Sequence, residues 1–462
     1  MKKVQCLLLV IMLLWCLLLL IPAAAEARAE TVFEEGDFQY TVLEDGTAEI
    51  TRFVGNVLVD ELTVPDTLGG HVVTGIGDKA FGSLTRLKSV TIPDNVIRVG
   101  NNPFSSCLSL EKIAVSPDHP TLETIGGALY SKPESRLICY PCALTETECA
   151  IPQGTAVIGD SAFFCCDRLI RVMIPDSVTE IGSYAFCGCR GLTGIVIPGS
   201  VVSVGTNPFI DCISMTAITL SPDHPVLTMT DGVLFSKPDR KLICCPCSAP
   251  AAEYAIPQGT VLIGDMAFYA CEDLADVSIP DSVTRVGDYA FCNCGSIREL
   301  MIPDSVTFIG EGAFQGCHSL TGLTIPDGVD RVEDWTFAFC DQLISVKLPD
   351  TVTGIGNGAF ICCFSLNGIT IPGRVTGIGE GTFDSCTSLI HITIPGSVTI
   401  IGDWAFARCD ALTDITIPDS VTSIGISAFA DCRSLTLAVP RGSYAAQYCQ
   451  ENDLIYIYQD TN

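Results

Sequence analysis

The sequence predicts an α/β solenoid, in which short coils stack one on another into a single elongated body. The first observation is a period of 23 residues between apolar-Pro steps, which holds without a break at Ile256, Ile279, Ile302, Ile325, Leu348, Ile371, Ile394 and Ile417. The second is a Phe after Ala, Pro or Thr, which marks thirteen units between Phe81 and Phe429. One such unit is too short to bury its own apolar side chains, so its neighbours must cover them.

Residues 169–192 illustrate how one unit is expected to fold. Val172 and Ile174 are two positions apart, as in a strand with one buried face, and Pro175 ends the strand because it has no N–H to donate. Apolar spacings of three and four follow and predict short helical or 3₁₀ return segments. Gly182 marks a point that needs either a positive φ or close approach of the next coil. We therefore expect a parallel sheet on one face and helical, 3₁₀ or extended returns on the other.

The string Ile-Pro-Asp-Ser-Val-Thr-x-Ile-Gly-x-x-Ala-Phe-x-x-Cys, best seen at Ile417–Cys432, resembles the BspA-like leucine-rich repeats of bacterial surface proteins. The resemblance covers residues 62–440. One departure is that Ser177 and its counterparts stand where the common leucine-rich pattern has Asn or Cys. The resemblance implies a leucine-rich-repeat fold and a role in surface adhesion and partner binding, whereas the periodicity alone predicts only a stacked solenoid.

Four segments follow one another along the chain. Residues 1–29 read as an export signal, because Lys2 and Lys3 precede the apolar run Cys6–Ile21 and small residues follow it. An uncleaved N-terminal anchor is the alternative. Residues 30–60 read as an N-terminal cap, residues 61–440 as the solenoid, and residues 441–462 as a C-terminal cap with a short helix and a strand. The expected location is secreted or cell-surface, with no membrane span after cleavage.

Two inserts, near residues 116–148 and 221–253, lengthen the local repeat from 23 to 36 positions. Their turn–strand–turn–strand patterns predict hairpins that protrude from the edge of the solenoid. Insertions in repeat proteins gather on one face, often the binding face, so we expect partner contacts at the insert tips. Lateral bracing of the solenoid is the alternative. The expected tip residues are His119, Tyr130, His224 and Phe235.

The chain carries a formal net charge of −28, which argues against a nucleic-acid partner, because phosphate binding needs clustered Lys and Arg. Asp follows the repeat Pro in several units and would form a ridge of carboxylates. A calcium site is one interpretation. Turn chemistry is favoured over it, because Gly199, Gly373 and Gln153 interrupt the ridge. No metal or other cofactor is expected.

The chain has 25 Cys, and twelve of them stand three residues after a repeat Phe. That regular position predicts buried, mostly free thiols that act as small core residues. Two C-x-x-C motifs fall in the inserts and are candidate disulfide or reactive-thiol sites, with local pairing or burial favoured over zinc or redox use. They comprise Cys139, Cys142, Cys244 and Cys247.

No set of residues in the sequence forms a credible catalytic site, and we expect no enzyme activity. None of the five His pairs with a Glu at metalloprotease spacing. Outward strand positions are mostly small or hydroxyl-bearing, and the exceptions are the candidate binding surface. These exceptions are Arg171, Met173, Glu299, Met301, Lys347, His391 and Asp414.

These observations predict an exported adhesion or recognition protein that binds a protein or glycan partner, for example on a host or neighbouring cell. The first alternative is a passive structural spacer at the cell surface. The second is a thiol oxidoreductase that uses the C-x-x-C pairs.

Overall fold

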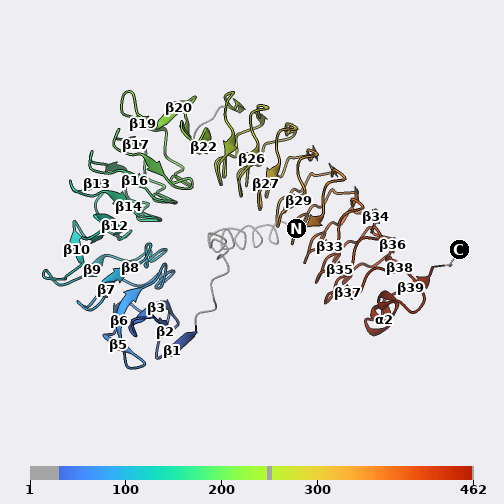
Figure 1. The fold of residues 1–462 in the computed structure, drawn as a ribbon, viewed down its shortest axis with the longest axis horizontal. Coiled ribbons are helices and arrows are strands. Elements are labelled where there is room, and N and C mark those ends of the chain that lie inside the picture. The colour runs from blue at the N-terminus through green and yellow to red at the C-terminus, as the bar shows by residue number, and fades with distance from the viewer. Residues whose placement is uncertain (1–30, 247–251, 460–462) are drawn as a thin grey trace.

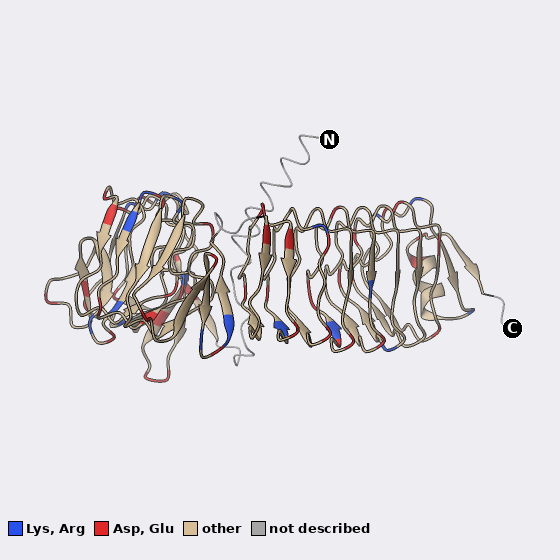
Figure 2. Ribbon diagram, turned by 90° about the horizontal axis from the view of Figure 1, so that it is seen from above, with Lys and Arg blue, Asp and Glu red and all other residues tan. Residues whose placement is uncertain are grey.

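The chain forms an open arc of stacked coils in the computed structural model, which describes residues 31–246 and 252–459 (Figure 1). The N-terminal strands lie at one end of the arc, and the helix α2 (Tyr444–Glu451) lies at the other. The expected export signal, Cys247 and the last three residues of the C-terminal cap lie outside the described residues. Figure 2 shows the coils of the C-terminal part side by side, each crossing the width of the body.

Each coil begins with a short strand, and these strands pair in parallel in six separate segments, which we together call the first-strand sheet. Its strands are β4 (Glu61–Thr63), β7 (Ser89–Thr91), β9 (Lys112–Ala114), β13 (Glu148–Ala150), β15 (Arg171–Met173), β17 (Gly194–Ile197), β19 (Ala217–Leu220), β23 (Glu253–Ala255), β25 (Asp276–Ser278), β28 (Gly322–Thr324), β30 (Ser345–Lys347), β32 (Gly368–Thr370), β34 (His391–Thr393), β36 (Asp414–Thr416) and β38 (Thr436–Val439). Paired residues are one 23-residue repeat apart in the sequence, as for Arg171 and Gly194. The central residue of a three-residue strand is buried and its neighbours face outward, as the alternation in the sequence predicts.

A second strand follows the turn in each coil, and these strands pair on another side of the core in four separate segments, which we together call the second-strand sheet. Most of its strands have two residues, because the following Gly and turn end the pairing. They are β6 (His71–Ile76), β8 (Arg98–Val99), β12 (Arg136–Cys139), β14 (Val157–Ile158), β16 (Glu180–Ile181), β18 (Ser203–Val204), β22 (Lys241–Cys244), β24 (Leu262–Ile263), β26 (Arg285–Val286), β27 (Phe308–Ile309), β29 (Arg331–Val332), β31 (Gly354–Ile355), β33 (Gly377–Ile378), β35 (Ile400–Ile401) and β37 (Ser423–Ile424).

The α/β class and the helical or 3₁₀ return segments are not confirmed. Within the described residues the returns consist of turns and the second strand, and α2 in the C-terminal cap is the one α-helix. The physical reason is a pair of left-handed residues in twelve of the thirteen returns that carry a repeat Phe, for example Tyr184 at φ 58° and Gly188 at φ 73°. A right-handed helix cannot continue through such residues, so apolar spacings of three and four arise here from stacked turns.

The repeat Gly after the second strand serves close approach of neighbouring coils. A Cβ on Gly182 would lie 2.5 Å from Asp160 Oδ1 and 2.6 Å from the Asp160 backbone N. The carboxylate of Asp160 in turn accepts the backbone N–H of Ser183 at 2.7 Å. Of the two roles predicted for Gly182, the second therefore holds, and any side chain there would push two coils apart.

The core is a ladder of stacked Phe rings that runs along the solenoid. Successive rings are stacked with centroids 5.0 to 5.8 Å apart, as for Phe163 and Phe186 at 5.0 Å. Each ring fills the space under its neighbour, and the fully buried Phe side chains are the largest in the core. This ladder explains why the repeat requires Phe at one position in every coil.

The repeat Cys forms a second ladder beside the Phe rings. In ten coils the Cys thiol donates a hydrogen bond to the backbone carbonyl of the Phe one coil earlier, at 2.9 to 3.2 Å. Cys317 and the Phe291 carbonyl, 3.2 Å apart, are one such pair. The predicted free thiols are confirmed for the Cys that the structure describes. Cys at this position therefore fills the core and also satisfies a buried carbonyl.

The caps close the two ends with antiparallel or helical structure. At the N-terminal end β1 (Val32–Glu35), β2 (Phe38–Val42) and β3 (Ala48–Phe53) form an antiparallel meander, and β3 pairs in parallel with β6. The short strand β5 (Thr67–Leu68) folds back on β6. At the other end α2 packs against β37 and β38, and β39 (Tyr456–Tyr458) pairs with β38. Both ends of the stacked core are thus covered.

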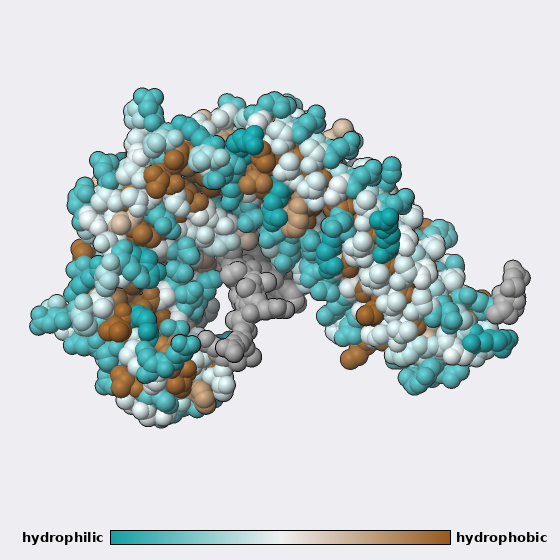
Figure 3. All heavy atoms as spheres, in the orientation of Figure 1, coloured by the Kyte–Doolittle hydropathy of each residue, from teal (hydrophilic) through white to brown (hydrophobic). Residues whose placement is uncertain are grey.

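Each insert consists of an antiparallel hairpin joined to a second strand. In the first insert β10 (Leu122–Ile125) pairs with β11 (Ala128–Ser131), which pairs with β12, and β12 then pairs in parallel with β14. In the second insert β20 (Leu227–Thr230), β21 (Val233–Ser236) and β22 repeat this order. Hydrophilic loops project from the outer side of the arc in its N-terminal half, where the inserts lie (Figures 1 and 3).

In each insert the middle strand, β11 or β21, is a wall that divides the core. Buried residues of the described chain fall into three main clusters, and each insert lies at the border of two of them. In β11, Leu129 belongs to the N-terminal cluster while Ala128 and Tyr130 belong to the central one. In β21, Leu234 belongs to the central cluster while Val233 and Phe235 belong to the C-terminal one. Both faces of these strands are therefore buried.

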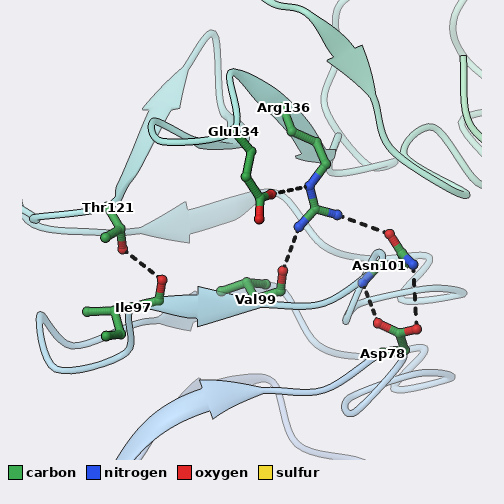
Figure 4. A network of polar contacts seen from close by, with 7 residues as sticks. All are labelled: Asp78, Ile97, Val99, Asn101, Thr121, Glu134 and Arg136. Atoms are coloured by element: carbon green, nitrogen blue, oxygen red, sulfur yellow. Dashed lines mark hydrogen bonds and ion pairs between the residues drawn. The ribbon is translucent and has the colours of Figure 1, made fainter. Parts of the chain in front are cut away.

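Arg136 fastens the first wall to the coil before it (Figure 4). Its guanidinium donates to the Val99 carbonyl at 2.8 Å, to Asn101 Oδ1 at 3.0 Å and to Glu134 Oε2 at 2.6 Å. The Asn101 backbone N–H is held in turn by Asp78 Oδ1 at 2.6 Å. Arg136 thus satisfies a carbonyl on β8, a strand that pairs with β6 on its other side. These contacts support the bracing interpretation of the insert.

Candidate binding surface

The exposed face of the first-strand sheet holds two columns of side chains. Strand pairing places Gly322 beside Ser345 and Gly368 beside His391, and Glu299 forms a bridge to Gly322. The other column contains Thr324 beside Lys347 and Thr370 beside Thr393. These positions face outward because the strand residue between them points into the core. The face is therefore flat, with glycine or hydroxyl groups at most positions.

A hollow of about 1180 Å³ lies on this face across β28, β30, β32 and β34. Its floor includes Gly322 and Gly368, which have no side chain to fill the space. Four of the residues selected from the sequence line it together with the small residues. They are Glu299, Met301, Lys347 and His391.

The remaining selected residues lie elsewhere on the first-strand sheet. Arg171 and Met173 are exposed on β15, in the four-stranded segment β13-β15-β17-β19 before the second insert. Asp414 is exposed on β36, one strand beyond the hollow. The sequence thus selected outward positions correctly, but the structure brings only four of the seven residues to one place.

The rim of the hollow is apolar as well as charged. The Met301 side chain is 85% exposed, and Ile344 is 47% exposed. Ile344 lines the hollow and was not selected from the sequence. The sequence did indicate that Ile344 is exposed, because the equivalent positions of the neighbouring repeats carry the polar residues Thr321 and Asn367. Exposed apolar side chains beside charges are typical of surfaces that bind other molecules.

The prediction of four residues at the insert tips is wrong. His119, Tyr130, His224 and Phe235 are buried, with at most 6% of each residue exposed. The aromatic pair lies in the two-sided walls, and the exposed tips are the turns at residues 125–127 and 230–232. The uninterrupted apolar runs of these strands are compatible with burial on both faces but do not require it.

The two His side chains hold the turns that precede the hairpins by hydrogen bonds to the backbone. His224 Nε2 lies 3.0 Å from the Pro198 carbonyl, and its Nδ1 accepts the Leu227 N–H at 3.1 Å. A neutral ring with its hydrogen on Nε2 makes both bonds, and burial lowers the pKa of His224. Lys237 Nζ donates to the His224 carbonyl at 2.6 Å. His119 makes the corresponding bonds in the first insert.

The C-x-x-C thiols lie in and beside the walls. Cys139 and Cys244 are buried, and Cys142 donates to the Cys107 carbonyl at 3.2 Å. Burial raises the pKa of Cys142 to about 11 and that of Cys139 well above its usual value. The nucleophilic form of a cysteine is the thiolate, so these two thiols are poorly suited to redox exchange. Cys247 lies outside the described residues.

The turn after the repeat Pro is held by hydroxyl groups rather than by the Asp. Ser177 Oγ donates to the Thr155 carbonyl at 2.8 Å and accepts the Gly154 N–H at 3.0 Å, and Ser282 repeats both bonds one insert later. Over residues 31–246 and 252–459, no three His, Cys, Asp or Glu side chains come together as metal ligands would. In the same residues no helix has the length and apolar character needed to cross a bilayer.

Several solved structures are similar to this chain. A solved leucine-rich cell surface protein from Faecalibacterium prausnitzii is 29% identical, with 79% of this chain and 95% of that chain covered and a TM-score of 0.44. A leucine-rich repeat protein from Bacteroides ovatus is 24% identical, with 93% and 100% covered and a TM-score of 0.48. The pneumococcal vaccine antigen PcpA is 17% identical, with 94% and 100% covered and a TM-score of 0.44. No curated protein matches the chain significantly.

A family model supplies the assignment. The model described as "BspA type Leucine rich repeat region (6 copies)" matches residues 53–145, 137–237, 245–326 and 307–436, well over half of the chain. These ranges contain the coils of the Phe and Cys ladders, the first insert and most of the second. The chain belongs to the BspA-type leucine-rich repeat family.

Proposed function

We propose that this chain is an exported recognition protein that binds a partner protein through the hollow on the first-strand sheet. The observation that carries the proposal is the combination of glycine floor, exposed Met301 and Ile344, and the charges of Glu299 and Lys347 at one place. Protein interfaces commonly combine such apolar contacts with a polar rim, and Met adapts to partners of irregular shape.

Export is the second part of the proposal. The charged start, the apolar run and the small residues within residues 1–29 support it, as does membership in a family whose repeats resemble those of bacterial surface proteins. A surface location would present the sheet face to molecules on neighbouring or host cells. Adhesion is one form that this recognition would take.

The experiment compares cell binding by the purified protein, residues 31–462, with that of two variants. Met301→Glu and Ile344→Glu place a charge on the rim of the hollow and should lower binding at least about tenfold. Met173→Glu is the matched control, since Met173 is 45% exposed on a different segment of the same kind of sheet. Protease treatment of the target cells should abolish binding.

The other outcomes exclude the proposal or redirect it. Equal binding by the wild type and both hollow variants would show that the hollow is not the site. Binding that survives protease but not removal of surface glycans would identify a glycan partner for this face. A passive spacer would bind no target cell at all.

A further inference from the structure

The last two Cys of the ladder, Cys409 and Cys432, lie on neighbouring coils at the C-terminal end of the solenoid. Three residues before them, the rings of Phe406 and Phe429 stack with centroids 5.5 Å apart and planes 2° apart. The residue before Cys409 donates its backbone N–H to the Ala430 carbonyl at 2.8 Å. The two backbones therefore run side by side at a separation of roughly 5 Å, and a disulfide spans Cα atoms about 4.4–6.8 Å apart.

The two sulfur atoms also lie near each other. The Cys432 thiol donates to the Phe406 carbonyl at 2.9 Å, so it leans toward the coil that carries Cys409. The two Cys side chains are close enough to share a hydrogen bond. A bond between the sulfurs therefore requires rotation of the side chains and no displacement of the coils.

Cys432 is accessible where the rest of the ladder is not. All twelve repeat Cys are described, and Cys432 is the only one of them that is not buried. The reason is its place at the end of the stack. Where another coil would lie, α2 supplies Tyr448, whose ring meets Phe429 edge-on with centroids 6.4 Å apart. This cap covers the Phe ring but leaves the Cys432 thiol half-buried.

The surroundings of Cys432 favour its thiolate. A hydrogen bond from the Cys409 side chain, together with one from the Cys409 backbone N–H, lowers the pKa of Cys432. Burial acts the other way deeper in the ladder and raises the pKa of Cys317 to about 12. The thiolate is the form that attacks a disulfide, so Cys432 is better suited to react than the buried thiols.

We propose that Cys409 and Cys432 form a reversible disulfide by exchange with a small-molecule disulfide. The Cys432 thiolate attacks one sulfur of that molecule, which gives a mixed disulfide and releases one small thiolate. Cys409 then gives up its proton and attacks the Cys432 sulfur, which releases the second small thiolate. Two protein thiols are oxidised, one small disulfide is reduced to two thiols, and the protons of the two protein thiols pass to the released thiolates.

The disulfide would fasten the unit that has least support. The coil of Phe429 has another coil on one side only, and in a repeat protein the interfaces with neighbours supply much of the stability of a unit. A cross-link to the preceding coil closes a loop of one repeat and restricts the unfolded chain. Cys409 and Cys432 take no part in the hollow on the first-strand sheet, so this inference does not depend on the proposed function.

The test begins with reduced residues 31–462, which are incubated in the folded state with oxidised glutathione. Remaining thiols are then alkylated in denaturant, and the protein is digested with trypsin without reduction. Trypsin cleaves after Arg408 and Arg433, so the peptide 409–433 contains Cys409 and Cys432 and no other Cys. We expect this peptide to lose both thiol hydrogens and to carry no alkyl group. In Cys409→Ser, Cys432 should retain glutathione as a mixed disulfide.

The matched control is a buried pair in the same digest. Cys363 and Cys386 are one repeat apart, and the Phe rings of their coils, Phe360 and Phe383, have the same 5.5 Å separation. Both should be alkylated, because oxidised glutathione cannot reach them in the folded chain. Urea unfolding should show a higher midpoint for the oxidised wild type than for the reduced one, and no such rise for Cys432→Ser.

Three results would overturn the proposal. The first is full alkylation of peptide 409–433 at a glutathione concentration that oxidises a free dithiol peptide. The second is wild-type protein that keeps glutathione on Cys432 without closing the bond to Cys409. The third is equal oxidation of Cys363 and Cys386, which would show that access does not select the terminal pair.

Discussion

At the scale of single residues, the interior is specified by two side chains that each do a separate task. Phe supplies the stacked surface that holds coils together, and Cys supplies a donor for the carbonyl beside that ring. A thiol is small and apolar enough for the core, yet it adds a second hydrogen bond to the Phe291 carbonyl, which also accepts the Cys294 N–H. The regular spacing of Cys predicted burial correctly but did not indicate the hydrogen bond, because spacing carries no information about the partner atom.

The thiol ladder gives a direct prediction for Cys317. Cys317→Ala removes one of the two hydrogen bonds to the Phe291 carbonyl, which keeps the bond from the Cys294 N–H at 3.2 Å, and should lower the free energy of unfolding by about 0.5–1.5 kcal/mol. Cys317→Ser keeps a donor and should cost less. Urea unfolding followed by circular dichroism measures both. If Ser proves more destabilising than Ala, the thiol acts only as an apolar filler.

His224 predicts a pH dependence of stability. Burial lowers its pKa in the folded chain, whereas the unfolded chain takes up the proton near pH 6.5. The contribution of the neutral ring is therefore complete above about pH 6.5 and is lost as the pH falls through the folded pKa. His224→Gln should cost about 1–2 kcal/mol at pH 8 and less at pH 5.

Urea unfolding of the wild type and His224→Gln at several pH values measures this difference. Other titrating groups are common to both proteins and cancel from the comparison. A difference in stability that stays constant from pH 8 to pH 5 would contradict the assignment of a neutral, bonded His224.

At the scale of elements, the inserts differ most from what the sequence led us to expect. Their hairpin form followed from the turn residues, but their middle strands are walls buried on both sides. Runs such as Ala128–Tyr130 fit a strand at the surface and a strand between two cores equally well when only local pattern is considered. Which of the two occurs depends on coils before and after the insert, and no local motif reports it.

A substitution of Arg136 tests whether its hydrogen bonds stabilise the first insert. Arg136→Ala removes hydrogen bonds to the Val99 carbonyl and Asn101 and should destabilise the first insert by about 1–3 kcal/mol. Amide hydrogen exchange of β10, β11 and β12 should rise, while exchange in the coils near β35 stays unchanged. Arg433→Ala is the control, since the Arg433 side chain is 86% exposed, and it should have little effect.

At the scale of the whole molecule, the core is continuous within each of three segments and interrupted between them. Stability in a repeat protein is a sum over units and their interfaces, so the walls should limit how far a local loss spreads. The solenoid and its parallel strands could be predicted from the 23-residue period. The left-handed pairs that exclude helices could not, because residues as different as Tyr184, Met266 and Gly312 occupy one such position.

Substitution of a core Phe tests whether the three segments of the core lose stability separately. Phe314→Ala leaves a cavity in the C-terminal cluster and should cost about 3–5 kcal/mol there. Hydrogen exchange should increase between residues 253 and 449 but not in the N-terminal cluster, whose residues include Ile50 and Val90. Phe81→Ala should produce the reverse pattern. Uniform loss of protection along the chain in either variant would show that the three segments unfold together.

The two walls also bear on how such a chain changes its length over generations. A duplication or deletion of one whole coil inside a segment leaves each wall with the same neighbours on both sides. Descendant sequences should therefore differ in length by whole repeats, and both inserts should be retained. The length of the solenoid could then change without any change in the contacts at the two walls.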